Sequence, residues 1–278
     1  MKNTKISSAK LAAFRKKVLR YFAEHKREFS WRTTREPWHV MVSEVMLQQT
    51  QTSRVEDKFP TFIALFPTPQ RMANAPLSAV LAAWQGMGYN RRALFLQKAA
   101  TEICARFGGA VPSTVEELES LPGIGPATAR SIAVYAFGAP EVFIETNIRA
   151  VFIHEFFAAS PAVSDEELRP LVARALDKND PWTWYNALMD YGVMLKEKHA
   201  NPARRSAHYA RQAPFETSDR KIRGQIIRIL TENRALAAKD ICARTGADKR
   251  RVDRCLAALG GEGFLAFDEE SAHYRIRT

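Results

Sequence analysis

The feature that most constrains the fold is a helical hydrophobic period that runs through most of the chain. From Ala9 to about Arg211, apolar residues recur every three or four positions, and prolines or glycines interrupt the pattern. No strand is expected there, so the sequence predicts an all-α array of many helices joined by short turns. Helix-start signals place helices after Ser43 (residues 44–51), Ser78 (79–84), Ser113 or Thr114 (115–119) and Ser164 (165–176).

The C-terminal part of the chain has a different pattern. A polar stretch with Pro214 predicts a linker over residues 213–218. Residues 221–232, 237–244 and 248–259 then have a helical period, with a turn at 245–246, and a break at 260–261 precedes alternating segments at 264–267 and 273–276. This order predicts a winged helix-turn-helix domain over residues 219–278. We expect Lys249, Arg250 and Arg251, on the helix that follows the turn, to contact DNA. The alternative is a dimerisation or protein-binding module.

The composition adds a partner class and a compartment. The 278 residues contain 41 Lys and Arg against 30 Asp and Glu, a net charge of +11, which favours nucleic acid as partner. From charge alone, a basic enzyme of another kind is the alternative. No apolar run is long enough to span a membrane and the N-terminus does not look like a signal peptide, so we expect a cytoplasmic, nucleoid-associated protein. Three scattered cysteines, Cys104, Cys242 and Cys255, predict neither disulfides nor a cysteine-bound metal.

The segment Leu121-Pro-Gly-Ile-Gly-Pro-Ala-Thr-Ala129 looks like the turn of a helix-hairpin-helix motif. Glycine permits the backbone of a tight turn, and the start of the following helix presents amide groups to a phosphate. Such a turn holds a DNA backbone without reading its sequence. A purely structural turn is the alternative. The residues expected to contact DNA here are Gly123, Ile124, Gly125, Ala127 and Thr128.

Further segments carry a resemblance to a known family. They are Trp31-Arg32 with Pro37-Trp38, Val42-Ser-Glu-Val-Met-Leu-Gln-Gln-Thr-Gln51, Trp84-Gln-Gly-Met-Gly-Tyr-Asn-Arg-Arg-Ala93 and Tyr185-Asn-Ala-Leu-Met-Asp-Tyr-Gly192. Together with the hairpin they resemble the adenine DNA glycosylases of the helix-hairpin-helix base-excision superfamily, which remove adenine mispaired with 8-oxoguanine. The resemblance implies a glycosylase domain over residues 1–212. Its six-helix core would span about residues 31–138, and residues 1–30 with 139–212 would form a second helical subdomain.

The resemblance also assigns catalytic roles. In the family, the glutamate that matches Glu44 protonates a ring nitrogen of the flipped base, so that the glycosidic bond breaks. Burial near an apolar helix start favours a protonated carboxyl independently, as a general acid requires. An aspartate of the family stabilises the sugar cation; this chain has Glu145 there, and Asn147 is expected to orient it. One extra methylene means that the site is either rebuilt around Glu145 or less active. The alternatives are a helix-cap carboxylate for Glu44 and an ordinary helix-start acid for Glu145.

Two departures from the family bear on chemistry. Lyase-type members have a lysine nucleophile where this chain has Ala127, so we expect a monofunctional glycosylase without strand cleavage. The four cysteines that hold an iron–sulfur cluster in the usual enzymes fall on Lys196, Ala203, Ser206 and Gln212, so no cluster and no other metal centre is expected. The resemblance still allows a monovalent ion at the hairpin. We expect Arg204 and Arg205, in the same loop, to contact phosphates; a solvated loop is the alternative.

The residues expected around the base also differ from those of the family. The expected base pocket consists of Trp31, Arg32, Ala127 and Ala187, and the family has hydrogen-bonding residues at the last two positions. Gln48, Gln49, Tyr89 and Asn90 are expected to contact DNA; the resemblance places Gln48 and Asn90 at wedges into the duplex, and the family has a second tyrosine at position 90. The family's C-terminal 8-oxoguanine-reading domain is replaced by the winged helix.

The expected function is therefore a monomeric glycosylase acting on double-stranded DNA that carries a mispaired or damaged base, with adenine the leading substrate. Thymine or uracil opposite guanine, or an alkylated purine, is the alternative substrate. A non-catalytic protein that binds DNA structures is the alternative of a different class.

Overall fold

The computed structural model describes residues 6–158, 160–207, 209, 215–216 and 218–277. The chain divides into two compact units. Unit 1 consists of Met1–Val40, Ser113–Glu116 and Gly125–Arg211, and unit 2 of Met41–Pro112, Glu117–Ile124 and Gln212–Thr278. This division places residues 219–278 in the same unit as residues 41–112. It differs from the expected domain boundaries at 138, 212 and 219, which stay a prediction. Residues 213, 214 and 217 of the expected linker lie outside the described residues.

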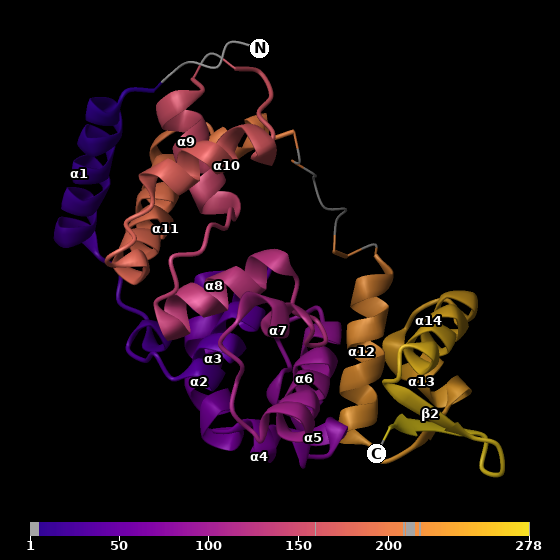
Figure 1. Ribbon diagram of the computed structural model, residues 1–278. Helices are drawn as coiled ribbons and strands as arrows, with labels where there is room; N and C mark the ends of the chain where they lie inside the picture. Colours follow the sequence, from indigo (N-terminus) through magenta and orange to yellow (C-terminus); the bar gives the residue numbers. More distant parts are fainter. Residues whose placement is uncertain (1–5, 159, 208, 210–214, 217, 278) are drawn as a thin grey trace. The chain divides into compact units, whose positions relative to one another are not determined.

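Unit 1 is built on long helices around one apolar core. It contains α1 (Ser8–His25), η1 (Ser30–Arg32), α8 (Pro126–Phe137), α9 (Thr146–Phe156), α10 (Asp165–Ala175), α11 (Pro181–Lys198) and η2 (Pro202–Arg205) (Figure 1). Helix α11 packs against both α1 and α9. Phe14 of α1 meets Phe152 of α9 and Trp184 of α11 edge to face, with ring centroids 5.4 and 5.8 Å apart. The Ser164 signal is confirmed, because Ser164 and Glu167 form a capping box at the start of α10.

Unit 2 begins within α2 (Pro37–Leu47), which starts in unit 1. Two predicted helix starts in this region are wrong: α2 begins at Pro37 rather than after Ser43, and α5 begins at Leu77 with Pro76 as its N-cap. Pro37 fixes the backbone angle that the first turn of α2 needs, and there it outweighs Ser43. The remaining helices here are α3 (Thr52–Leu65), α4 (Pro69–Ala73), α5 (Leu77–Ala83) and α6 (Arg91–Phe107), while α7 (Val115–Glu119) begins in unit 1 and ends in unit 2.

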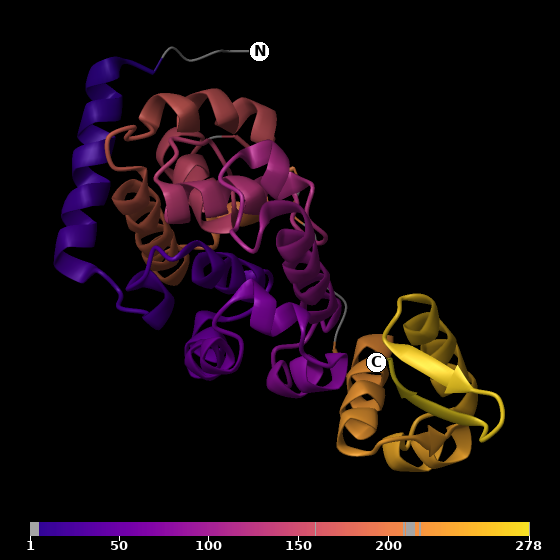
Figure 2. The same ribbon diagram turned by 60° about the horizontal axis from the view of Figure 1, so that its bottom comes forward.

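The C-terminal part of unit 2 has the order helix, strand, helix, helix, strand, strand. It contains α12 (Asp219–Glu232), β1 (Leu236–Ala237), α13 (Ala238–Thr245), α14 (Lys249–Gly261), β2 (Leu265–Asp268) and β3 (His273–Ile276). The strands form an antiparallel sheet in the order β1-β3-β2, which Figure 2 shows beside the helices. Gly246 ends α13 with a left-handed φ of 64°, and the Asp248 side chain caps α14. The predicted break at 260–261 instead completes α14, and the two-residue β1 was not predicted.

The expectation of an all-α fold with a small C-terminal sheet is confirmed by these elements. No helix within the described ranges combines the length and the apolar character needed to cross a bilayer.

Candidate functional site

A buried arginine organises the predicted wedge residues of unit 2. The guanidinium of Arg92, at the start of α6, donates through Nη1 and Nη2 to oxygen atoms of three separate segments. Burial lowers the pKa of Arg92 to about 10, which still leaves it charged at neutral pH. A fixed planar fork of donors suits this role better than a flexible ammonium. The acceptors are the carbonyls of Val45, Met46, Gln48, Met87 and Gly88 and the hydroxyl of Thr50, at 2.6–3.1 Å.

Two of the predicted DNA contacts have a left-handed backbone. Gln49 has a φ of 54° and Tyr89 a φ of 47°, a conformation that non-glycine residues seldom adopt. In both cases Arg92 binds the carbonyl of the preceding residue, Gln48 or Gly88. One guanidinium therefore holds both strained turns. Such strain persists only where the surroundings enforce it, and it gathers at functional sites.

The same turns line a cavity of about 1500 Å³ in unit 2. Its lining includes the predicted DNA contacts Gln48, Gln49, Tyr89, Asn90 and Gly123. The structure therefore brings together residues that the sequence places in three separate motifs.

Glu44 lies in the last turn of α2, not at the start of a helix. It is partly buried, and the carbonyls of the next two residues, Val45 and Met46, are held by Arg92. The alternative interpretation, a carboxylate that stabilises the first turn of a helix, is wrong because that turn begins seven residues earlier, at Pro37.

Glu145 is the N-cap residue of α9 in unit 1. Its Oε1 accepts hydrogen bonds from the backbone amides of Asn147 (2.5 Å) and Ile148 (3.1 Å), and its Oε2 lies 3.5 Å from Asn147 Nδ2. Burial raises the pKa of Glu145, while the two amides and the positive charges of Lys196 and Arg149 act in the opposite direction. The carboxyl group is thus fixed in place by its own helix, in agreement with the alternative of a helix-start acid. That placement is compatible with a catalytic role.

Helix α11 fixes the start of α9 from the other side. A Cβ on Gly192 would come within 2.8 Å of both Cβ and the carbonyl oxygen of Asn147, so only glycine allows this approach. One turn earlier, Met189 Sδ lies 3.7 Å from Asn147 Nδ2. Asn147 Oδ1 is buried and has no hydrogen-bond partner among the residues that the structure describes. Lys196, one turn later, has its pKa lowered by burial, against the charge of Glu145.

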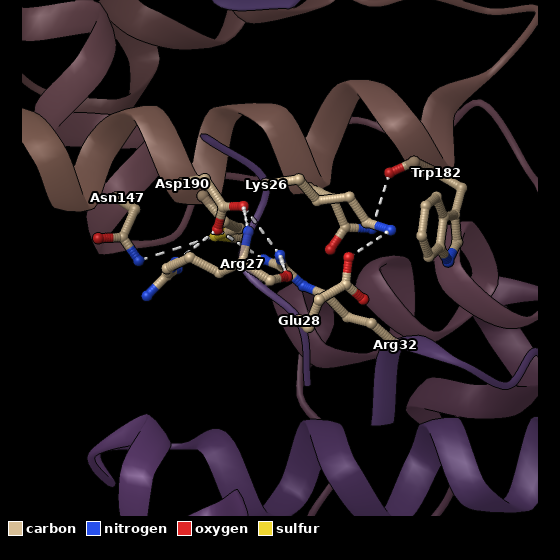
Figure 3. A network of polar contacts seen from close by, with 9 residues as sticks. Lys26, Arg27, Glu28, Arg32, Asn147, Trp182 and Asp190 are labelled. Carbon is tan, nitrogen blue, oxygen red and sulfur yellow. Dashed lines mark hydrogen bonds and ion pairs between the residues drawn. The ribbon is translucent and has the colours of Figure 1, made fainter. Parts of the chain in front are cut away.

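A buried ion network lies next to Asn147 in Figure 3. Asp190 of α11 is 1% exposed and accepts four hydrogen bonds, two each from Arg27 and Arg32, at 2.7–3.1 Å. Trp31 lies between these arginines in sequence, and its ring stacks on Phe29 with centroids 4.5 Å apart. The network therefore fixes the segment after α1 on α11.

Two predicted base-pocket residues have other surroundings in the structure. The Arg32 guanidinium is bound to Asp190 and its side chain is only 8% exposed. Ala187 is fully buried in the apolar core of unit 1, so it has no surface to offer a base. Trp31 is buried as well, whereas Ala127 is exposed in the first turn of α8.

The hairpin turn has the backbone that the sequence predicts. Gly123 has a φ of 79°, and a Cβ there would come within 2.7 Å of Phe95 Cβ. Ile124 is buried and donates to the Leu121 carbonyl at 3.2 Å. Gly125 is the N-cap of α8, and Ala127 and Thr128 follow in its first turn. The turn thus ends at a helix N-terminus, the position that suits a phosphate.

The loop after α11 does not fit an iron–sulfur cluster. Lys196, Ala203 and Ser206 offer no thiolate, and Gln212 lies outside the described residues. In the described ranges no group of three or more His, Cys, Asp and Glu side chains is placed to hold a metal ion. Arg205, predicted at phosphates, donates to the carbonyls of Phe157 (2.7 Å), Ala158 (2.7 Å) and Ser160 (3.3 Å) after α9, while Arg204 is exposed.

The cationic face predicted on α14 is partly neutralised within the chain. Arg251 and Arg254 both bind the carboxylate of Asp219, with their Nη2 atoms at 2.8 and 3.0 Å. Lys249 pairs with Asp253 at 3.2 Å. Arg250 is exposed.

Sequence reasoning missed the structural role of Arg92, Asp190 and Lys196. Arg92 and Asp190 stand inside the quoted motifs, next to apolar residues, and a charge in such surroundings is a usable signal for a buried ionic contact. For Lys196 the sequence indicated only that it occupies the position of a cluster cysteine of the family.

Comparisons with known proteins agree with this arrangement. Residues 42–241 match the model of the HhH-GPD superfamily base excision DNA repair proteins. The chain is 32% identical to "Adenine DNA glycosylase" of Mycolicibacterium smegmatis, over 89% of this chain and 91% of the relative. It is 31% identical to "Thymine/uracil-DNA glycosylase" of Pyrobaculum aerophilum, over 60% of this chain and 75% of the relative. Six further relatives are longer, and the chain spans 36% to 50% of their length.

The fold agrees too. The solved structure of a thermostable thymine-DNA glycosylase superposes with a TM-score of 0.60 at 22% identity, over 67% of this chain and 87% of that one. Because the family model covers well over half of the chain, the chain belongs to the HhH-GPD superfamily of base excision DNA repair proteins.

Proposed function

We propose that the protein is a monofunctional DNA glycosylase, which flips a mispaired or damaged base out of duplex DNA and hydrolyses its N-glycosidic bond. Family membership and relatives named as glycosylases support the reaction class. Adenine is the leading substrate, because the relative that covers most of this chain is named an adenine DNA glycosylase and the Glu44 segment resembles that group.

The observation that carries the proposal is the fixed carboxyl group of Glu145. Two amides hold its Oε1, and among the residues that the structure describes Oε2 has only a long contact, to Asn147. A preorganised, desolvated carboxylate of this kind stabilises a positive charge that develops on the sugar as the bond breaks. The charge of that sugar in turn favours the ionised form of Glu145, against the effect of burial.

Glu44 supplies the proton in this proposal. Its position in the last turn of α2, beside carbonyls that Arg92 immobilises, gives it a defined backbone. As general acid it protonates the leaving base, which departs neutral; water then adds to the sugar cation and releases a proton, which restores the Glu44 carboxyl. Asn147 Oδ1, a buried acceptor with no partner among the described residues, is suited to accept a hydrogen bond from that water.

The longer side chain of Glu145 does not argue against activity. A glutamate at the N-cap reaches its own first-turn amides here, so the extra methylene is accommodated by capping geometry. We therefore propose a site rebuilt around Glu145 rather than a degraded one.

We propose that the enzyme has no lyase step and no iron–sulfur cluster. Position 127, exposed in the first turn of α8, carries an alanine and thus no amine that could form a Schiff base. Borohydride should trap no covalent adduct between the pure protein and its DNA; an adduct would contradict the monofunctional assignment. Iron and acid-labile sulfide should be absent from the purified protein.

Thymine or uracil opposite guanine is the second candidate substrate. It is favoured by the relative named for these bases and by Ala127, which offers no side-chain hydrogen bond to an adenine.

The test is a panel of labelled duplexes with adenine, thymine, uracil, hypoxanthine or an alkylated purine opposite guanine or 8-oxoguanine. Alkali cuts each strand from which a base has been released. Glu44→Gln should lower single-turnover release by at least about 100-fold while DNA binding persists. The matched control is Glu166→Gln, an exposed residue of α10, which should be as active as the wild type. Binding without release from any duplex would favour the non-catalytic alternative.

A further inference from the structure

The cavity in unit 2 has a wall that the proposed chemistry does not use. One side consists of the Gln48–Gln49 and Tyr89–Asn90 turns held by Arg92, and the other side is helix α12 of the C-terminal module. From α12 the lining residues include Arg220, Gly224, Gln225 and Arg228. Within unit 2, α12 also contacts α5, so the module packs directly on the glycosylase-like helices.

The charge of the lining points to an anionic ligand. Within the described residues, seven cationic side chains and one acidic side chain line the cavity. The acid, Glu262, is paired with Arg91 (3.3 Å) and Arg223 (2.6 Å). Arg54 and Arg228 are exposed and have no acidic partner in the part of the chain that the structure describes. Two uncompensated cations in the lining of one cavity suit phosphates of a nucleic-acid strand.

The interior of the cavity offers contacts for a base. Tyr89 is 37% exposed, and the guanidinium groups of Arg92 and Arg220 lie 5.5 and 5.8 Å from its ring centroid. Arg220 Nη1 also donates to the Tyr89 hydroxyl at 2.9 Å, which links α12 to the strained turn. Gln225 adds an amide, which can both donate to and accept from a base edge. An aromatic face beside cations and amides is the usual platform for an unstacked base.

Gly224 supplies an independent observation. It lies in the middle of α12, where glycine destabilises a helix relative to alanine. No atom of the described residues lies within 4 Å of a Cβ built at this position, so no neighbour in that part of the chain requires a glycine. The space that the missing side chain leaves belongs to the cavity.

We propose that helix α12 is a DNA-contact element, and that it closes a pocket for one unpaired nucleotide of a DNA strand. The base lies beside Tyr89 and over Gly224, and the flanking phosphates lie against Arg54 and Arg228. This proposal rests on the proposed function only in taking DNA as the ligand. It assigns the contact of the C-terminal module to α12 rather than to α14, where Arg251 and Arg254 already bind Asp219.

The main test fills the space at Gly224. Gly224→Leu is compared with Gly260→Leu, which places the same side chain on a helical glycine of α14 that also has open space around it but does not line the cavity. Binding is measured by fluorescence anisotropy with two labelled duplexes of the same sequence, one fully paired and one with a single unpaired nucleotide. We expect Gly224→Leu to weaken binding of the second duplex about tenfold. The paired duplex should change by less than about twofold, and Gly260→Leu should leave both unchanged.

A second pair of variants tests the phosphate contact without altering the helix. Arg228→Glu should weaken binding and reduce the dependence of log Kd on log salt by about one unit. Arg250→Glu, an exposed charge reversal on α14, should have the smaller effect. Gly224→Ala serves as the folding control, because it should raise the thermal unfolding midpoint and keep binding near that of the wild type.

The proposal is overturned if Gly224→Leu binds the unpaired nucleotide as tightly as the wild type. It is also overturned if Gly224→Leu weakens both duplexes equally, or if Arg250→Glu has the larger effect on the salt dependence. None of these measurements needs base release. A protein that releases no base from the duplex panel can therefore still show the effect at Gly224, and an active glycosylase can lack it.

Discussion

The two units each use one buried charge to fix an irregular segment, but the charges are of opposite kind. In unit 2 the cation Arg92 binds neutral oxygen atoms at the end of α2 and in two strained turns. In unit 1 the anion Asp190 binds two arginines after α1. Losing Arg92 would leave neutral acceptors, whereas losing Asp190 would leave two cations without their acid. We therefore expect the loss of Asp190 to lower the free energy of unfolding more than the loss of Arg92 does.

The largest effect is expected from Asp190→Ala. Removing the acid leaves Arg32, 8% exposed, with an uncompensated charge, which should lower the free energy of unfolding by about 3–5 kcal/mol. Asp190→Asn keeps the shape and one acceptor, so it should destabilise less. Denaturant unfolding followed by circular dichroism measures both, with the exposed Asp253→Ala on α14 as control. A change as small as that of Asp253→Ala would contradict the argument that Asp190 compensates the charge of buried arginines.

Arg92→Met tests the other half of the comparison. The variant keeps the apolar stem but leaves several carbonyl oxygens without their donor, so we expect about 2–3 kcal/mol of destabilisation. Because Gln49 and Tyr89 lose the group that holds their left-handed turns, DNA binding should also weaken. Arg106→Met on the same helix breaks exposed contacts, a pair with Glu102 and a hydrogen bond to the Ser120 hydroxyl, and is the matched control. Equal effects of the two variants would contradict an organising role for Arg92.

Two helical glycines, one in each unit, sharpen the contrast between close packing and open space. A methyl group at Gly192 meets the Asn147 backbone at 2.8 Å, whereas one at Gly224 meets nothing within 4 Å. Gly192→Ala should therefore destabilise by about 1–3 kcal/mol. By moving Asn147 and Glu145 it should also lower base release about 100-fold. Gly224→Ala should stabilise by about 0.5–1 kcal/mol. Thermal unfolding and single-turnover kinetics distinguish them, and stabilisation by Gly192→Ala would contradict the packing argument.

The buried carboxyl of Glu145 should leave a mark on the pH dependence of stability. Because its pKa is raised in the folded state, the associated stability is present below the unfolded pKa of about 4.3 and is lost as pH rises through the folded pKa. Glu145→Gln removes this titration. The wild type should therefore lose stability relative to the variant as pH increases from about 4 to 8. Urea unfolding at several pH values measures the difference in the free energy of unfolding between the two proteins. A difference that stays constant over this pH range would contradict the prediction.

The sequence predicted local features well and long-range contacts poorly. Ser164, Gly246 and Asp248 act through their nearest neighbours, and each helix end or start at these residues is as expected. Ser43 failed because Pro37 starts the helix earlier, which shifts Glu44 from the first turn to the last.

The polar contacts of the site could not be predicted in this way. Arg92 binds oxygens 42–47 residues away as well as nearby ones, and Asp190 binds arginines about 160 residues away. No periodicity encodes such a partner. For the same reason Arg205 was expected at phosphates, although its guanidinium binds carbonyls after α9.

The smallest effect is expected at Asp219, the first residue of α12. Its substitution tests which of the two candidate helices of the C-terminal module, α12 or α14, contacts DNA. Its carboxylate binds Arg251 and Arg254, and these contacts lower its pKa. The groups are largely exposed, so Asp219→Asn should cost only about 0.5 kcal/mol near neutral pH. That contribution is present above the unfolded pKa and is lost as pH falls through the folded one.

The substitution also releases two arginines of α14. If α12 makes the DNA contact, affinity for a paired duplex should rise no more than with Asp253→Asn, which releases Lys249 on the same helix. A much larger rise would make α14 the DNA-contact helix, because the two arginines that lose their acid partner both lie on α14.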